Sequence, residues 1–338
     1  MKADMGSACH KVMELAAEAK QYIQNNPDTT IVKCGSYEFA RDDFLREQTL
    51  TDSEVDLVNK SRLSKTIYKS DMSIPYGHKR KGVDMINTLI KDASNYYCSK
   101  SPEEWPKASF RDVVNWTWIV LDYRGGVYDP RLQNIKCPEK HFDLTIDKDW
   151  AKYDYTDTAG IHHSGNFGIK GTVDLITEVD SDTLEVTDYK TGQRLDWATG
   201  EVKTYDKLCN DTQLMMYYYA LTKVFPEYEN IIITIFYVRD GGPFTMCFDK
   251  HHIPIVEARL EAHFNEVRAC KLPEMCSVDQ SSFKCTRLCN YFKESINGTK
   301  TNTCRFIHNE IKAKGIDQVT RDWKVKGFSS SFYQSPGS

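Results

Sequence analysis

The sequence predicts an α/β fold in which a central mixed β-sheet is flanked by helices, with a mostly helical region before it and a cysteine-rich segment after it. Two observations support this class. Segments with apolar residues at helical spacing alternate with short β-branched runs, an alternation typical of α/β proteins. The runs at 171–176 and 184–192 are separated only by a polar turn, which predicts a hairpin at the centre of the chain.

Helices are expected over 7–26, 79–94, 108–122, 211–224 and 254–271. The first has apolar residues at Val12, Leu15, Ala16 and Ile23, and Asn25-Asn26-Pro27 ends it. Asp211 is the expected N-cap of the fourth helix, which stops before Pro226. Residues 30–63 show no clear pattern.

Strands are expected over 134–146, where Pro138 interrupts the run, and over 166–176, 184–192, 231–238 and 244–248. The stretch 148–165 is polar and aromatic, with tandem histidines, and no element is assigned to it. The basic stretch 190–210 is predicted as a loop or short hairpin. Four regions follow: a helical region over 1–105, the α/β core over 106–272, a cysteine-rich segment over 273–328 and a disordered tail over 329–338.

Composition narrows the function classes. The net charge of −4 and the pI of about 6.2 exclude a protein that coats nucleic acid through bulk positive charge. No signal peptide opens the chain and no run of 18 apolar residues is present, so we expect a cytoplasmic protein. In that compartment the eleven cysteines stay reduced, and clustered cysteines indicate a metal site rather than disulfides.

Two acids and a lysine are expected to meet on the predicted hairpin. Asp174 lies near the end of its first strand, and Asp188 and Lys190 lie near the end of the second. Residues two apart on a strand face the same side, so Lys190 accompanies Asp188. Two carboxylates can hold Mg²⁺ or Mn²⁺, and a lysine can orient water and offset charge on a phosphate. The alternative is an exposed salt bridge, which is common at strand ends.

Three motifs extend this pattern: Gly171-x-x-Asp174, Asp188-Tyr-Lys-Thr-Gly192 and Gln213-x-x-x-Tyr217. Together they resemble the RecB-type branch of the PD-(D/E)XK nucleases, whose core is restriction-endonuclease-like. The resemblance implies that Asp174, Asp188 and Lys190 are catalytic, that Gln213 and Tyr217 support the site or contact the strand, and that Glu139 is the upstream acid. It places the metal on Asp174, Asp188, Tyr189 and Glu139. Branch members also carry a histidine, preceded by glycine, on an early helix, and Gly77-His78 is the candidate here.

The resemblance implies a divalent-metal-dependent DNA nuclease, expected to be an exonuclease encoded by a phage or mobile element and acting in the host cytoplasm. The alternatives are an RNA- or structure-specific nuclease of the same fold and a non-catalytic nucleic-acid-binding module. No Gly-x-x-x-x-Gly-Lys-[Ser/Thr] loop is present, so unwinding would need a separate helicase. A single-strand-binding or recombination protein is another possible partner.

Four cysteines fall within 29 residues, at Cys276, Cys285, Cys289 and Cys304. Their thiolates would complete a tetrahedral metal site, although free buried cysteines are the alternative. The family resemblance implies a [4Fe-4S] cluster, with structural Zn²⁺ as the second possibility. Cys34 or Cys98 could replace one ligand.

Overall fold

The computed structural model describes residues 2–45, 83–101, 104–156, 160–195, 200–240, 242–269 and 303–326. The chain divides into two compact units. Unit 1 consists of Met1–Leu144 and Ile169–Glu257, and unit 2 consists of Thr145–Gly168 and Ala258–Ser338. The four regions expected from composition stay a prediction.

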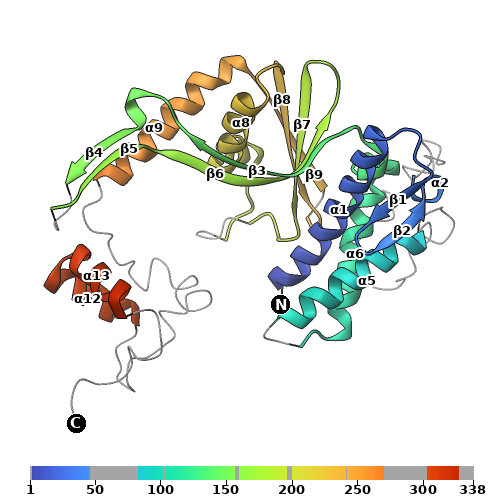
Figure 1. Ribbon diagram of the computed structural model, residues 1–338, viewed down its shortest axis with the longest axis horizontal. Helices are drawn as coiled ribbons and strands as arrows, with labels where there is room; N and C mark the ends of the chain where they lie inside the picture. Colours follow the sequence, from blue (N-terminus) through green and yellow to red (C-terminus); the bar gives the residue numbers. More distant parts are fainter. Residues whose placement is uncertain are drawn as a thin grey trace, which may run out of the picture. The chain divides into compact units, whose positions relative to one another are not determined.

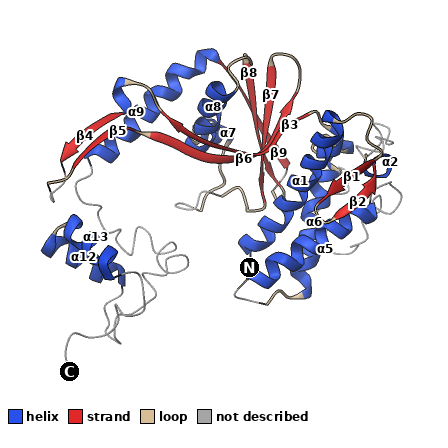
Figure 2. Cartoon of the chain, viewed as in Figure 1, coloured by secondary structure: helices blue, strands red, loops and turns tan. Residues whose placement is uncertain are grey.

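Unit 1 is built on a mixed five-stranded sheet (Figure 2). Its strands, in spatial order, are β3 (Ile135–Thr145), β6 (Gly168–Glu178), β7 (Thr183–Lys190), β8 (Asn230–Tyr237) and β9 (Gly242–Asp249). The β6/β7 and β8/β9 pairs are antiparallel, whereas β7 and β8 are parallel. The predicted mixed sheet and its central hairpin are confirmed.

Strands β6 and β7 pair over only part of their lengths. Their register runs from Glu178 opposite Leu184 to Leu175 opposite Thr187, and the next residues are Asp174 and Asp188. Beyond that point β7 continues beside β8 up to Lys190. Asp174 therefore lies in the middle of β6, not near a strand end as expected, and the two acids face each other where β6 and β7 separate.

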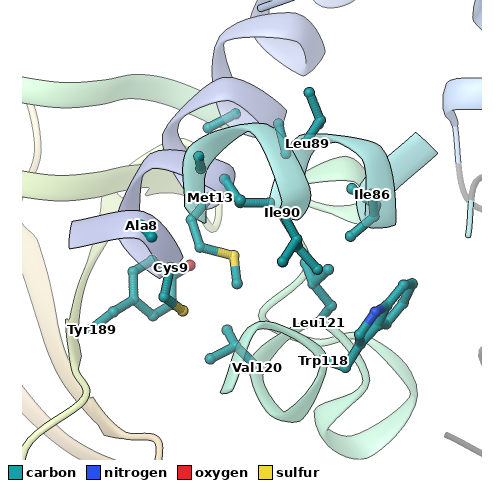
Figure 3. Close-up of a cluster of buried hydrophobic side chains, with 14 of the residues drawn as sticks. Ala8, Cys9, Met13, Ile86, Leu89, Ile90, Trp118, Val120, Leu121 and Tyr189 are labelled. Carbon is teal, nitrogen blue, oxygen red and sulfur yellow. The ribbon is translucent and has the colours of Figure 1, made fainter. Parts of the chain in front are cut away.

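Three helices pack together on one side of the sheet: α1 (Lys2–Asn25), α5 (Val83–Lys100) and α6 (Lys107–Leu121), shown in Figure 1. Figure 3 shows their shared core, in which Cys9 and Met13 of α1 lie near Ile90 of α5 and Leu121 of α6, and the Tyr189 ring of β7 joins them. The predicted helix over 108–122 is confirmed, and the helix expected to end at 94 continues to Lys100.

Helix α8 (Thr212–Val224) begins as predicted, with the Asp211 side chain accepting a hydrogen bond from the Gln213 amide. Its Tyr218 ring stacks on Phe248 of β9 at 5.1 Å, so α8 packs against the sheet through aromatic contacts. Within the stretch predicted as a loop or short hairpin, an antiparallel bridge joins Leu195 to Val202, and a short helix, α7, spans Tyr205–Cys209.

The outer edge of β3 is covered by glutamines of α1. Gln24 accepts from the Ile135 amide at 2.8 Å and donates to the Ile135 carbonyl, while Gln21 donates to the Lys136 carbonyl at 2.7 Å. Side-chain amides thus take the place of a further strand, which satisfies an edge that would otherwise be open to pairing. Unit 1 also contains the hairpin of β1 (Ile31–Cys34) and β2 (Tyr37–Ala40), followed by α2 (Arg41–Phe44).

Unit 2 contains an antiparallel hairpin of β4 (Lys152–Thr156) and β5 (His162–Asn166). The sequence analysis assigned no strands here, because they are short and largely exposed, without an alternating apolar face. Helix α9 (Ile253–Ala269) reaches this unit, where Phe264 stacks on Phe167 at 4.6 Å. Two further helices follow, α12 (Thr303–Lys314) and α13 (Ile316–Lys326). Across the described ranges, no helix has the length and apolar character needed to cross a bilayer.

Candidate functional site

The site is centred on the acids that face each other where β6 and β7 separate. The Tyr189 amide donates to Asp174 Oδ2 at 2.8 Å, and Lys190 Nζ lies 2.7 Å from Asp188 Oδ2. Asp188 is almost fully buried, with 3% of its side chain exposed, whereas Lys190 is 36% exposed. Burial raises the pKa of Asp188, and the negative charge of Asp174 adds to that effect, while Lys190 opposes it. A buried acid beside a second acid favours a cation at this point.

His10 of α1 completes this group, and sequence reasoning missed it. Its Nδ1 lies 3.4 Å from Asp174 Oδ2. Burial alone would lower the pKa of His10, but the two acids outweigh it and raise that pKa. Burial of Asp174 alone would raise its pKa. The interactions with His10, the Tyr189 amide and Lys190 outweigh burial, so the pKa of Asp174 is lowered overall. His10 and Asp174 therefore stabilise each other's charged forms.

Gly6 explains how α1 comes so close. A Cβ at Gly6 would stand 2.6 Å from Thr191 Oγ1, in the loop that follows β7. A larger residue there would require the Thr191 hydroxyl to move, and one helical turn later the same face of α1 presents His10. A glycine followed four residues later by a histidine on the predicted first helix was the available signal. The predicted candidate, His78, lies outside the described residues, whereas His10 lies beside Asp174.

Helix α8 holds Asp188 from the other side. Tyr217 donates through its hydroxyl to Asp188 Oδ1 at 3.3 Å, and Gln213 Nε2 donates to the same hydroxyl at 2.6 Å. Residues four apart share a helix face, which allows Gln213 and Tyr217 to act in series. Burial and the Asp188 charge raise the pKa of Tyr217, so its phenol stays protonated and donates. Phe142 packs edge-on against the Tyr217 ring at 6.2 Å.

Glu139 reaches the same site through an unusual backbone. It has a φ of 45°, one of two positive values at described residues other than glycine, and it directly follows Pro138. The strand continues through Pro138 instead of breaking there, and a left-handed residue inside a strand is typical of a β-bulge that redirects a side chain. Burial and the nearby Asp174 raise the pKa of Glu139.

Part of this group lines a cavity of about 450 Å³, formed by α1, α5, β3 and the end of β7, whereas Asp174, Asp188, Gln213 and Tyr217 are not among its lining residues. The cavity brings together His10, Glu139 and Lys190 with the backbone of Tyr189. The Tyr189 ring points away into the core, where burial raises its pKa well above the ordinary value, so only the backbone of this residue is available as a metal ligand.

The residues present fit a hard divalent cation. Asp188 Oδ2 is buried and makes no hydrogen bond of normal geometry, although Lys190 Nζ lies 2.7 Å away, and the neighbouring acid Asp174 adds a second carboxylate. Among the described residues, no group of three or more histidine, cysteine or acidic side chains is placed to hold a metal ion. Mg²⁺ suits such an open site because it is usually bound by one or two carboxylates and keeps several waters.

Most of the predicted cysteine site lies outside the described residues. Cys276, Cys285 and Cys289 lie outside the described residues, and Cys304 is on α12 of unit 2. Cys34 is buried in the core of unit 1, where its thiol donates to the Leu15 carbonyl and burial raises its pKa to about 12. A neutral thiol with that environment is poorly suited to replace a thiolate ligand.

Comparison with known proteins agrees with this geometry. The family model described as the PD-(D/E)XK nuclease superfamily matches residues 93–306, which is more than half of the chain. No curated protein and no solved structure matches. The five-stranded mixed sheet flanked by helices is consistent with the restriction-endonuclease-like α/β fold. The chain therefore belongs to the PD-(D/E)XK nuclease superfamily, whose members are metal-dependent hydrolases of phosphodiester bonds.

Proposed function

We propose that this protein is a DNA exonuclease of the RecB-type branch. The observation that carries the proposal is the junction of Asp174 and Asp188 with Lys190, completed by His10 from the first helix. A histidine on an early helix is a feature of that branch, and His10 lies on the first helix of this chain. The Gln213–Tyr217 series on α8 supports the same assignment.

Asp174, Asp188 and Glu139, with the Tyr189 carbonyl, would hold Mg²⁺ or Mn²⁺. When bound, the metal polarises the scissile phosphate and lowers the pKa of water. Lys190, more than a third exposed, is placed to orient the attacking water and to offset charge on the phosphate. His10 keeps Asp174 ionised, and Tyr217 fixes the orientation of Asp188.

The test uses single-stranded DNA, double-stranded DNA and RNA, each labelled at one end, incubated with Mg²⁺ or Mn²⁺ and sampled over time. We expect DNA to shorten progressively from one end, with no loss of RNA, and Asp188→Ala to remove the activity. Internal fragments appearing first would contradict the exonuclease assignment. Preferred degradation of RNA would contradict the DNA assignment, and binding without cleavage would identify a non-catalytic module.

A metal held by Cys276, Cys285, Cys289 and Cys304 is a second part of the proposal. Four cysteines within 29 residues can close a [4Fe-4S] or Zn²⁺ site. Because thiolates prefer softer metals than Mg²⁺, the role would be structural. Anaerobic purification should give a brown protein absorbing near ~400 nm or one stoichiometric zinc. Four freely titratable thiols in metal-free native protein would refute it.

A further inference from the structure

The cavity at the site is larger than the metal chemistry needs. Beyond His10, Glu139 and Lys190, its lining includes Lys11 of α1, Tyr97 of α5 and the loop after β7 at Gly192. A volume of about 450 Å³ lies in the range of small-ligand pockets. We infer that this part of the cavity, defined by Lys11, Glu14, Tyr97 and Gly192, binds one unpaired nucleotide of the substrate strand beside the scissile phosphate. The inference rests on the proposed nuclease function.

Tyr97 supplies an aromatic surface. Its ring is half-buried and held edge-on by Tyr96, with centroids 5.1 Å apart and planes at 89°. A ring held in place in this way loses little entropy when a base stacks on it, and aromatic stacking accepts any of the four bases. Tyr96 itself is 58% exposed and is not part of the cavity lining.

The charges of this part favour a base and sugar over a second phosphate. Lys11 Nζ lies 2.6 Å from Glu14 Oε1, so its charge is largely neutralised. The pair presents a donor and an acceptor side by side, which suits the polar edge of a base. The phosphate would lie at the other residues of the cavity, near Lys190.

The nucleotide must be unpaired. Helices α1 and α5 both line the cavity, and a B-form duplex, whose major groove alone is about 12 Å wide, does not enter a space of about 450 Å³. Entry therefore requires a single-stranded or separated end, as for enzymes that act on bases taken out of the stack.

The first experiment measures binding without cleavage. Deoxynucleoside 5′-monophosphates are titrated into the full chain in Ca²⁺ by calorimetry. Tyr97→Ala should weaken binding about 5- to 150-fold, the range that corresponds to loss of one stacked base. The control Tyr22→Ala, which removes an exposed tyrosine of α1 that does not line the cavity, should bind like wild type. Wild-type protein that binds no monophosphate, or an equal loss in both variants, would overturn the inference.

A second variant does not alter the core. A Cβ at Gly192 meets no atom within 4 Å, and its φ is outside the left-handed region, so a side chain is tolerated there. Gly192→Leu should occupy the cavity and abolish monophosphate binding with an unchanged melting temperature, whereas Gly192→Ala should bind nearly normally. Unchanged binding in Gly192→Leu would contradict the inference.

The two proposals can fail separately. If the protein binds monophosphates in a Tyr97-dependent manner but cleaves no nucleic acid, the proposed function fails and the pocket stands. If it degrades DNA while monophosphate binding is insensitive to Tyr97 and Gly192, the pocket is wrong and the nuclease assignment stands.

Discussion

Removing the Tyr217 hydroxyl tests whether α8 acts on catalysis through Asp188. A hydrogen bond to a charged group contributes about 1.5–3 kcal/mol. The Tyr217–Asp188 distance of 3.3 Å exceeds the usual O–H···O range, so the lower end applies. About 1.5 kcal/mol corresponds to roughly a tenfold loss of rate. The substituted ring in Tyr217→Phe keeps its packing against Phe142, so the fold should persist.

Gln213 provides the second arm of a double-mutant cycle. It donates to the Tyr217 hydroxyl at 2.6 Å, a neutral bond worth about 1 kcal/mol, so Gln213→Ala alone should cost about fivefold in rate. If it acts through Tyr217, the same change in the Tyr217→Phe background should cost nothing further.

The assay is the initial rate of cleavage of an end-labelled oligonucleotide over a range of Mg²⁺ concentrations, with thermal melting in parallel. Tyr218→Phe is the matched control, since its hydroxyl donates to the Asp249 carbonyl. That variant should lose some stability and keep its activity per folded molecule. Additive losses for Gln213 and Tyr217 would refute action in series and favour independent contacts with the strand.

Three further predictions concern the acids and the lysine. Asp188→Ala or Lys190→Ala should abolish cleavage while DNA binding in Ca²⁺ persists, because phosphate contacts elsewhere carry affinity; wild-type rates would remove both residues from the catalytic site. Glu139→Gln should weaken Mg²⁺ dependence less than Asp174→Asn does. Titration of activity with Mg²⁺ measures both effects, and the reversed order would contradict this prediction. Burial raises the pKa of Glu185 in the folded protein above its value of about 4.3 in the unfolded chain. Ionisation of this carboxyl therefore destabilises the folded protein as the pH rises above the unfolded pKa. Glu185→Gln should therefore raise the melting temperature at pH 7 and not at pH 3.5, and equal gains at both would contradict this.

The sequence alone determined what local periodicity encodes. Asp188 and Lys190 share a strand face because they are two apart, and Gln213 and Tyr217 share a helix face because they are four apart. Asp211 began α8 as an N-cap because its side chain bonds an amide two residues on. Each of these relations joins residues only a few positions apart in the chain, and the family motifs are built from such short spacings.

Only the tertiary structure decided which distant residues join the site. His10 meets Asp174 because Gly6 lets α1 approach Thr191, a contact between segments far apart in the sequence. Glu139 reaches the cavity because its own backbone is left-handed, a conformation that no strand pattern predicts. Tyr97 reaches the same cavity because α5 packs on α1. Packing between distant segments fixes each of these positions, and local spacing along the chain does not determine which distant segments pack together.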